Sequence, residues 1–358
     1  MLILGIESSC DETAAAVIEA AEGGRLVLRS SIVASQTELH KRFGGVVPEI
    51  ASRAHTEAIV RITGEALERA RTSVGQLSAI GVTYTPGLIG ALLVGVNFAK
   101  ALAYSAGVPL VGVNHIKAHA AATFIATDAA ADPPEQLDPA PLPTPDSPAL
   151  VLVASGGHTS ILLMRSPTQY ETLGRTRDDA MGEAFDKIGR VLGLPYPGGA
   201  ALDRLAAEFF ASGREPTLSL PSAAIAGDTL DFSFSGLKTC VLDMVNRLRM
   251  KGGEPDPAEL AAALTVTIAD SVVRRLDRAL ELTGARTLIA AGGVTANSHL
   301  RRAITELAGR RGVRLHLPPL RLCGDNAAMV AAQAYFELME GNIAPPSLNG
   351  VATGASEL

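Results

Sequence analysis

Residues 2–20 read LILGIESSCDETAAAVIEA, two apolar runs separated by a polar turn. The runs Leu2–Glu7 and Ala14–Ala20 predict two strands joined by a turn over Ser8–Thr13. A third apolar run, Leu26–Val33, follows two glycines and predicts a third strand. The amino-terminal stretch therefore predicts three consecutive strands, with which a mixed sheet can begin.

Helices and strands alternate after this opening. The helical periods begin after turn residues, and the strands are short, apolar and β-branched. In chain order the pattern predicts a helix from Pro48 to about Ala70, a strand Ala79–Tyr84, a helix ending near Ala106, a strand Val108–Val113 and a helix Ala118–Ala126.

The same order recurs in the second half. It predicts strands Ala149–Val153, Ser160–Met164 and Tyr170–Gly174, a helical middle section, a strand Thr287–Ala290, a helix Ser298–Ala308, a strand Val313–Leu317 and a helix Gly324–Glu340. The repeat predicts a duplicated actin/Hsp70/sugar-kinase-like α/β fold (ribonuclease H-like), with a nucleotide in the cleft between two domains. A single doubly wound α/β sheet is the alternative.

The domain boundaries follow from this repeat. We expect residues 1–126 and the last helix, about 325–345, to form the first domain. Residues 150–324 form the second, with a helical insertion over about 178–250. Residues 127–149 hold seven prolines and no apolar period, which predicts a mobile surface linker or insertion, with plain disorder as the preferred interpretation.

Composition limits the cellular setting. The chain has 358 residues, 47% of them hydrophobic, and a net charge of −6, which suits a soluble protein of about two domains. We find no signal peptide and no apolar run of the roughly 18 residues that a membrane helix needs, so no membrane partner is expected. The three cysteines, Cys10, Cys240 and Cys323, are far apart and indicate a reduced, cytoplasmic protein.

The acidic balance argues against a large autonomous nucleic-acid surface. Basic residues do gather in a few places, and we interpret them as solvated helix faces, with nucleic-acid contact as the alternative. These residues are Lys41, Arg42, Arg53, Arg301, Arg302, Arg310, Arg311 and Arg314.

Two histidines, His115 and His119, are spaced for a metal site. Residues four apart on a helix share one face, so both imidazoles can reach one ion. Asp325, at the start of the last predicted helix, is either an N-cap or the third ligand. Two histidines and one carboxylate leave open positions and suit Fe²⁺, or alternatively Zn²⁺.

Glycine-rich turns suggest nucleotide contacts. Ser155–Thr159 (SGGHT) joins two predicted strands, where bare backbone amides can approach a phosphate, although such a turn can also be only a turn. Asn297 ends a Gly-Gly turn, where it either bonds an adenosine or caps a helix.

Acidic residues mark two further places. Glu7, Asp11 and Glu12 lie at the first hairpin turn, where carboxylates can bind Mg²⁺, act as a base or simply be solvated. Kinases of this fold present Asp followed by Gly and Ser/Thr there, so Glu7 argues against plain phosphoryl transfer. Asp178–Lys187 predicts a helix with acids in its first turn.

Taken together, these stretches resemble one family, the tRNA N6-adenosine threonylcarbamoyltransferases, formerly called O-sialoglycoprotein endopeptidases. The resemblance extends from residue 4 to about 335 and omits only the Pro-rich segment. Its motifs are Gly5–Thr13, Gly45–Arg53, the His115/His119 segment, Ser155–Thr159, Gly182–Lys187, Tyr196–Gly199, Phe232–Thr239, Gly292–Asn297 and Asp325–Met329.

The resemblance implies an acyltransferase that moves threonylcarbamoyl from threonylcarbamoyl-AMP to N6 of the adenosine next to the anticodon, in tRNAs reading codons that begin with A. His115, His119 and Asp325 would hold the metal, commonly iron. The adenylate would contact Val153, Ala154, Ser155, Gly156, Gly157, Asp186, Gly199 and Asn297. We assign Glu12 as the base or the residue that orients the amine.

The resemblance also implies partners: tRNA, a paralogous (TsaB-type) subunit and a small (TsaE-type) ATPase. Three positions depart from the family pattern, namely Thr85, Lys117 and Ala200, and none of them is a proposed ligand. A metalloprotease is disfavoured because Ile116 stands where a zincin has its glutamate. An actin-fold kinase or ATPase, and a non-catalytic paralogue scaffold, remain as alternatives.

Overall fold

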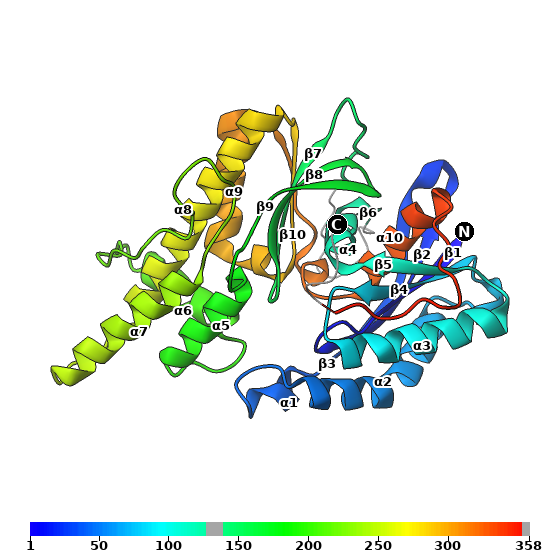
Figure 1. Cartoon of the computed structure of the whole chain (residues 1–358), viewed down its shortest axis with the longest axis horizontal. Helices are drawn as coiled ribbons and strands as arrows, with labels where there is room; N and C mark the ends of the chain where they lie inside the picture. The colour runs from blue at the N-terminus through cyan, green and yellow to red at the C-terminus, as the bar shows by residue number, and fades with distance from the viewer. Residues whose placement is uncertain (127–138, 353–358) are drawn as a thin grey trace. The chain divides into compact units, whose positions relative to one another are not determined.

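The computed structural model describes residues 1–126 and 139–352. The chain forms two compact units. Unit 1 comprises Met1–Pro145, Met164–Tyr170 and Pro318–Leu358, and unit 2 comprises Asp146–Leu163 and Glu171–Leu317. Each unit is built on one sheet (Figure 1). The predicted Pro-rich segment lies partly outside the described residues, and its residues 139–148 belong to no helix or named strand.

The sheet of unit 1 has the strand order β5-β4-β1-β2-β3-β6. The first three strands pair antiparallel in sequence order, whereas β4 and β5 run parallel to β1. The strands are β1 (Leu2–Glu7), β2 (Glu12–Ala20), β3 (Leu26–Ser35), β4 (Ala79–Thr85), β5 (Leu110–Asn114) and β6 (Ile125–Ala126).

Helices cover both faces of this sheet. α2 (Pro48–Arg69) and α3 (Ile89–Ala106) pack together on one face. α10 (Ala327–Met339) packs on the other face, toward which Gly5 of β1 points. A Cβ atom on Gly5 would lie 2.2 Å from the carbonyl oxygen of Ala327, so only glycine allows this approach of helix to strand.

α3 is, within the part of the chain that the structure describes, the one helix long and apolar enough by length and composition to cross a membrane. The expectation that no apolar run reaches this length was therefore wrong. The helix packs against α2 and β4, and its buried residues include Leu92 and Val96. Its apolar character thus serves the core of unit 1.

The sheet of unit 2 has the order β11-β10-β7-β8-β9. β7 runs parallel to β10, and β10 runs parallel to β11. This repeats the order of β5 through β3 in unit 1, so the predicted duplication is confirmed. The strands are β7 (Ala149–Ala154), β8 (Thr159–Ser166), β9 (Gln169–Arg175), β10 (Thr287–Ala291) and β11 (Arg314–His316).

The core of unit 2 lies between this sheet and its helices. Phe232 and Phe234 are fully buried there and stack with ring centroids 5.6 Å apart, which gives their segment a packing role. The helices of unit 2 are α5 (Met181–Val191), α6 (Gly198–Ala211), α7 (Ser235–Met250), α8 (Pro257–Thr283) and α9 (Ser298–Arg311).

Short elements complete the chain. In unit 1 these are α1 (Thr37–Lys41) and α4 (His115–Ala121). The 3₁₀ turns are η1 (Glu22–Gly24), η2 (Val74–Gln76), η3 (Ala122–Phe124), η4 (Gly293–Ala296) and η5 (Leu320–Leu322).

Two predicted helices are placed differently. The helix predicted over Ala118–Ala126 is wrong at both ends, because α4 starts at His115 and residues 125–126 pair with β3 instead. The helix predicted over Asp178–Lys187 begins only at Met181. Asp178 lies outside it and accepts hydrogen bonds from the backbone amides of Phe234 and Ser235, so its carboxylate stabilises the start of α7.

Candidate metal centre and active site

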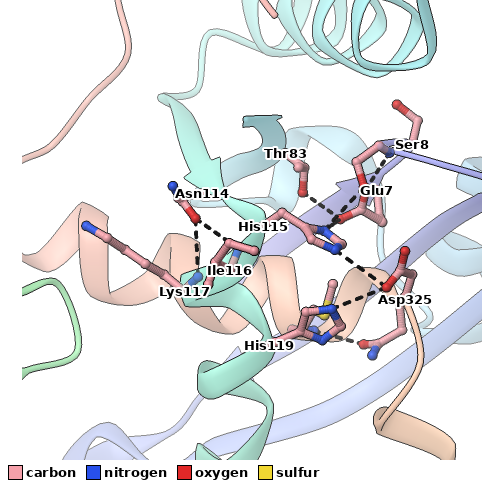
Figure 2. Close-up of polar contacts among 12 residues, drawn as sticks. Glu7, Ser8, Thr83, Asn114, His115, Ile116, Lys117, His119 and Asp325 are labelled. Atoms are coloured by element: carbon pink, nitrogen blue, oxygen red, sulfur yellow. Dashed lines mark hydrogen bonds and ion pairs between the residues drawn. The ribbon is translucent and has the colours of Figure 1, made fainter. Parts of the chain in front are cut away.

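The site lies at the carboxyl ends of three parallel strands. β1 ends at Glu7, β4 carries Thr83 next to that end, and His115 follows β5 directly. The registers place Ile6 opposite Val82, so these ends are neighbours across the sheet. Ligand sites in α/β proteins form at such ends, and here the polar side chains converge on one point (Figure 2).

Three side chains offer donors to one metal ion. Nε2 of His115 lies 3.5 Å from Oδ1 of Asp325, and Nε2 of His119 lies 3.3 Å from the same oxygen. One donor atom from each residue falls within 4.8 Å of the others. Two donors about 2.1 Å from a metal and at a tetrahedral angle lie about 3.4 Å apart. The donor set therefore fits a metal ion.

Helix caps explain this arrangement. The Asn114 side chain accepts hydrogen bonds from the amides of Ile116 and Lys117, at 2.9 and 3.3 Å, and so starts α4 at the first histidine. Both histidines then lie on one short helix, with ring centroids 4.6 Å apart. Asn326, not Asp325, caps α10 by accepting from the amide of Met329 at 3.0 Å. The capping alternative for Asp325 is therefore wrong.

The environments of the two histidines differ. Burial lowers the pKa of His119 although the nearby Asp325 carboxylate opposes this, and its Nδ1 has no hydrogen-bond partner among the described residues. Burial also opposes charge on His115, but Asp325 and Glu7 outweigh it and raise its pKa to about 9. Glu7 is fully buried, which disfavours its charge, yet His115 and its other hydrogen bonds keep its pKa below the usual value. At the Nδ1 edge of the ring, a carboxylate thus supports His115 but not His119.

Glu12 begins β2 in a half-buried position. Its Oε1 accepts a hydrogen bond from the Ser35 hydroxyl at 2.8 Å, and its buried Oε2 has no partner among the described residues. Burial raises the pKa of Glu12 to about 7, with Asp11 and Asp325 adding to this effect. Burial likewise raises the pKa of the Cys10 thiol well above its usual value, so this thiol stays protonated.

The glycine turns of unit 2 pack against one another. Val153 and Ala154 end β7, and the turn Ser155–His158 follows with Gly156 and Gly157 exposed. A Cβ atom on Gly182 would lie 2.7 Å from Cα of Gly156. The start of α5 therefore lies directly against this turn.

The remaining predicted adenylate residues lie in or next to helices of unit 2: Asp186 in α5, Gly199 at the start of α6 and Asn297 before α9. Gly292 has a φ of +96°, and a Cβ atom there would lie 2.3 Å from the carbonyl oxygen of Ala154. Asn297 caps α9 by accepting from Leu300 at 2.9 Å, as its capping alternative predicted. Asp186 accepts from the amide of Gly199 at 3.1 Å. What these residues bind stays a prediction.

Several basic residues pair with acids at the surface. Arg53 contacts Glu49 at 2.7 Å, and Arg311 contacts Asp277. These ion pairs support the interpretation that Arg53 and Arg311 belong to solvated helix faces. Lys117, a departure from the family pattern, donates to the carbonyl of Thr168 at 3.0 Å.

The contact of Glu7 with a histidine was not predicted from the sequence. Oε2 of Glu7 lies 3.0 Å from Nδ1 of His115, although the two are 108 positions apart. The available signal was an acid at the carboxyl end of the first strand, and in the sheet β4 lies between this strand and β5, which precedes the histidines.

Fold and site together define a class: an actin-like protein with a metal-binding donor set at the strand ends of one unit. Solved structures support the fold. Component A of (R)-2-hydroxyglutaryl-CoA dehydratase from Acidaminococcus fermentans is 15% identical, with a TM-score of 0.51 over 95% of this chain and 99% of that chain. Full-length HypF gives a TM-score of 0.56 at 13% identity, over 95% of this chain and 47% of HypF.

Sequence relatives identify the family. The family model for tRNA N6-adenosine threonylcarbamoyltransferase matches residues 27–332. Proteins of that name from Clostridium botulinum (strain Kyoto) and Moorella thermoacetica are each 46% identical over 349 residues, covering 98% of this chain and 96% and 95% of theirs. The chain belongs to the tRNA N6-adenosine threonylcarbamoyltransferase family, and it is an acyltransferase.

Proposed function

We propose that the chain transfers threonylcarbamoyl from threonylcarbamoyl-AMP to N6 of the adenosine next to the anticodon, in tRNAs that read codons beginning with A. Family membership supports the reaction. The observation that carries the mechanism is the set of three donors from His115, His119 and Asp325 at the strand ends of unit 1. We propose Fe²⁺ as the ion, with Zn²⁺ as the alternative.

The reaction is an acyl transfer without redox change. The N6 amine attacks the carbamoyl carbon, the bond between this carbon and the phosphate oxygen breaks, and AMP leaves with the electron pair. When bound, the metal supplies Lewis-acid stabilisation of charge on the carbonyl and phosphate oxygens. The adenine amine is a weak nucleophile, so its positioning governs the rate.

Glu12 is our candidate for accepting the proton that N6 loses. A base works best with a pKa near the working pH, and Glu12, with a pKa of about 7, meets this condition. Its Oε2 lacks a hydrogen-bond partner among the described residues, so the carboxylate has an oxygen on which to hold the proton.

We assign the adenylate to unit 2. The exposed amides of Gly156 and Gly157 suit phosphate oxygens, and Asn297 suits the adenosine. The other contacts follow the family resemblance and comprise Val153, Ala154, Ser155, Asp186 and Gly199. As partners we propose tRNA, a paralogous subunit and a small ATPase, in the cytoplasm.

The test is mass spectrometry of nucleosides from tRNA incubated with the protein, its partners and threonylcarbamoyl-AMP. We expect the N6-threonylcarbamoyl product from the wild type and none from His119→Ala, whose bound metal should also fall. His316→Ala, in β11, is the matched histidine control and should retain both. Full metal and full transfer in His119→Ala would refute the metal centre. ATP-dependent phosphorylation of a sugar without tRNA modification would favour the kinase alternative.

A further inference from the structure

Glu7 is a buried carboxylate that the proposed reaction does not use. It is 0% exposed and ends β1 in unit 1. A fully buried carboxylate is unfavourable unless hydrogen bonds compensate for the lost water. Glu7 therefore needs partners that hold it in its ionised form.

Three donors surround Glu7, each from a different segment of unit 1. The amide of Ser9 donates to Oε1 at 2.6 Å. The Thr83 hydroxyl donates to Oε2 at 2.7 Å, and Nδ1 of His115 lies 3.0 Å from the same oxygen. Both oxygens are thereby occupied, and Glu7 is not among the three residues whose donor atoms fit one ion. Its carboxylate supports a ligand and is not a ligand itself.

The geometry of His115 shows what this support does. The Nδ1 edge of the ring faces Glu7 at 3.0 Å and, at the longer distance of 3.3 Å, the Ser9 hydroxyl, and the Nε2 edge faces Asp325 (Figure 2). An imidazole that binds a metal through Nε2 carries its proton on Nδ1, and an acceptor there fixes both the tautomer and the ring orientation. His119 has no such acceptor among the described residues.

We infer that Glu7 is a positioning residue for the metal centre: it accepts the Nδ1 proton of His115 and holds Nε2 toward the metal. The inference rests on the proposed metal site. A carboxylate held in this way is not free to bind a further cation. Here Thr83 and Ser9 already use the oxygens of Glu7.

Glu7→Gln tests this role with nearly unchanged shape. The amide has one acceptor and one donor end. If its oxygen faces His115, its NH₂ group opposes the Ser9 amide. If it turns, the NH₂ group opposes the Nδ1 proton of a metal-bound His115. Either orientation places two donors against each other, and the loss of such an outer partner typically weakens metal binding by about 10–100-fold.

The first measurement is a chelator-buffered Zn²⁺ titration of the full chain. We expect Glu7→Gln to bind Zn²⁺ about 10–100-fold more weakly than the wild type. Thr83→Val is the matched control, because it removes one donor to Glu7 but leaves the acceptor for His115. It should lose less affinity. Equal affinity of the wild type and Glu7→Gln would overturn the inference alone. If the wild type binds no Zn²⁺, or if His119→Ala binds it as tightly as the wild type, the metal centre itself is refuted as well.

The second measurement needs no Glu7 variant, so misfolding of that variant cannot decide the outcome. Histidine-ring ¹⁵N NMR of the Zn²⁺-loaded wild type should show His115 protonated on Nδ1 and bound through Nε2, assigned by comparison with His115→Ala. Binding of the metal through Nδ1 would overturn the inference.

Discussion

Glu12→Gln separates a stability role from a catalytic role. The substitution replaces a half-buried carboxylate with a neutral side chain of almost the same shape. The folded protein binds the Glu12 proton more tightly than the unfolded chain does, since burial raises the pKa from 4.5 to about 7. The wild type is therefore destabilised progressively as the pH rises from about 4.5 to 7, and fully above that range.

The magnitude follows from the shift. One pKa unit corresponds to about 1.4 kcal/mol, so the full shift of Glu12 gives about 3 kcal/mol, and partial exposure reduces this to about 1.5 kcal/mol. The Gln variant lacks the penalty. We expect its free energy of unfolding, relative to the wild type, to be higher at pH 8 than at pH 5 by about 1–1.5 kcal/mol.

Urea unfolding with EDTA at both pH values measures this difference. Glu19→Gln on the same strand is the control, since Glu19 pairs with Arg29 at the surface. It should show no comparable gain at pH 8. A Glu12→Gln variant equally stabilised at both pH values would refute the electrostatic reasoning, because a carboxylate of ordinary pKa produces no such dependence.

Activity is the second readout for Glu12→Gln. Single-turnover transfer from preformed threonylcarbamoyl-AMP should fall by roughly 10²–10⁴-fold if Glu12 is the base. The wild-type rate should rise with pH through about 7 as Glu12 loses its proton. Unchanged transfer in the variant would show that Glu12 is not the base, whatever its effect on stability.

Two further substitutions test packing and capping. Gly5→Ala should destabilise unit 1 by about 1–3 kcal/mol in urea unfolding, since the new methyl group meets the α10 backbone. Gly64→Ala in α2, where the space around the glycine is open, is the control and should not destabilise the unit. Equal effects of the two substitutions would contradict the close approach of β1 to α10. Asp178→Ala should destabilise unit 2 by about 1 kcal/mol, because the hydrogen bonds at the start of α7 are lost. Asp228→Ala, at an exposed aspartate, is the control. Unchanged hydrogen exchange of the Phe234 and Ser235 amides in Asp178→Ala would contradict this role.

The succession of strands along the chain was predictable because hydrophobic periodicity marks each strand. The apolar runs of β1, β4 and β7 are short and almost wholly buried, so their pattern marks them as strands without tertiary information. Ends of helices were less predictable. The alanines after His119 favour a longer helix, but Ile125 and Ala126 gain more by pairing with β3, a contact between segments about 100 positions apart.

The candidate site, too, could be predicted from the sequence only in part. His115 and His119 share a helix, so their spacing revealed them, and the family motif supplied Asp325. The role of Glu7 depends on which strands become neighbours. Only the pairing of β1 with β4, and of β4 with β5, brings its carboxylate to Nδ1 of His115. A single sequence contains the acid but not the pairing.

The duplicated fold assigns different chemistry to equivalent turns. In unit 1 the turn between β1 and β2 carries Ser8–Asp11, followed at once by Glu12, so side-chain carboxylates and hydroxyls dominate. In unit 2 the turn between β7 and β8 carries Ser155–His158, with two exposed glycines that present backbone amides. Carboxylates repel phosphate, whereas amides attract it. The proposed anionic adenylate is thus better matched to the turn of unit 2 than to the equivalent turn of unit 1.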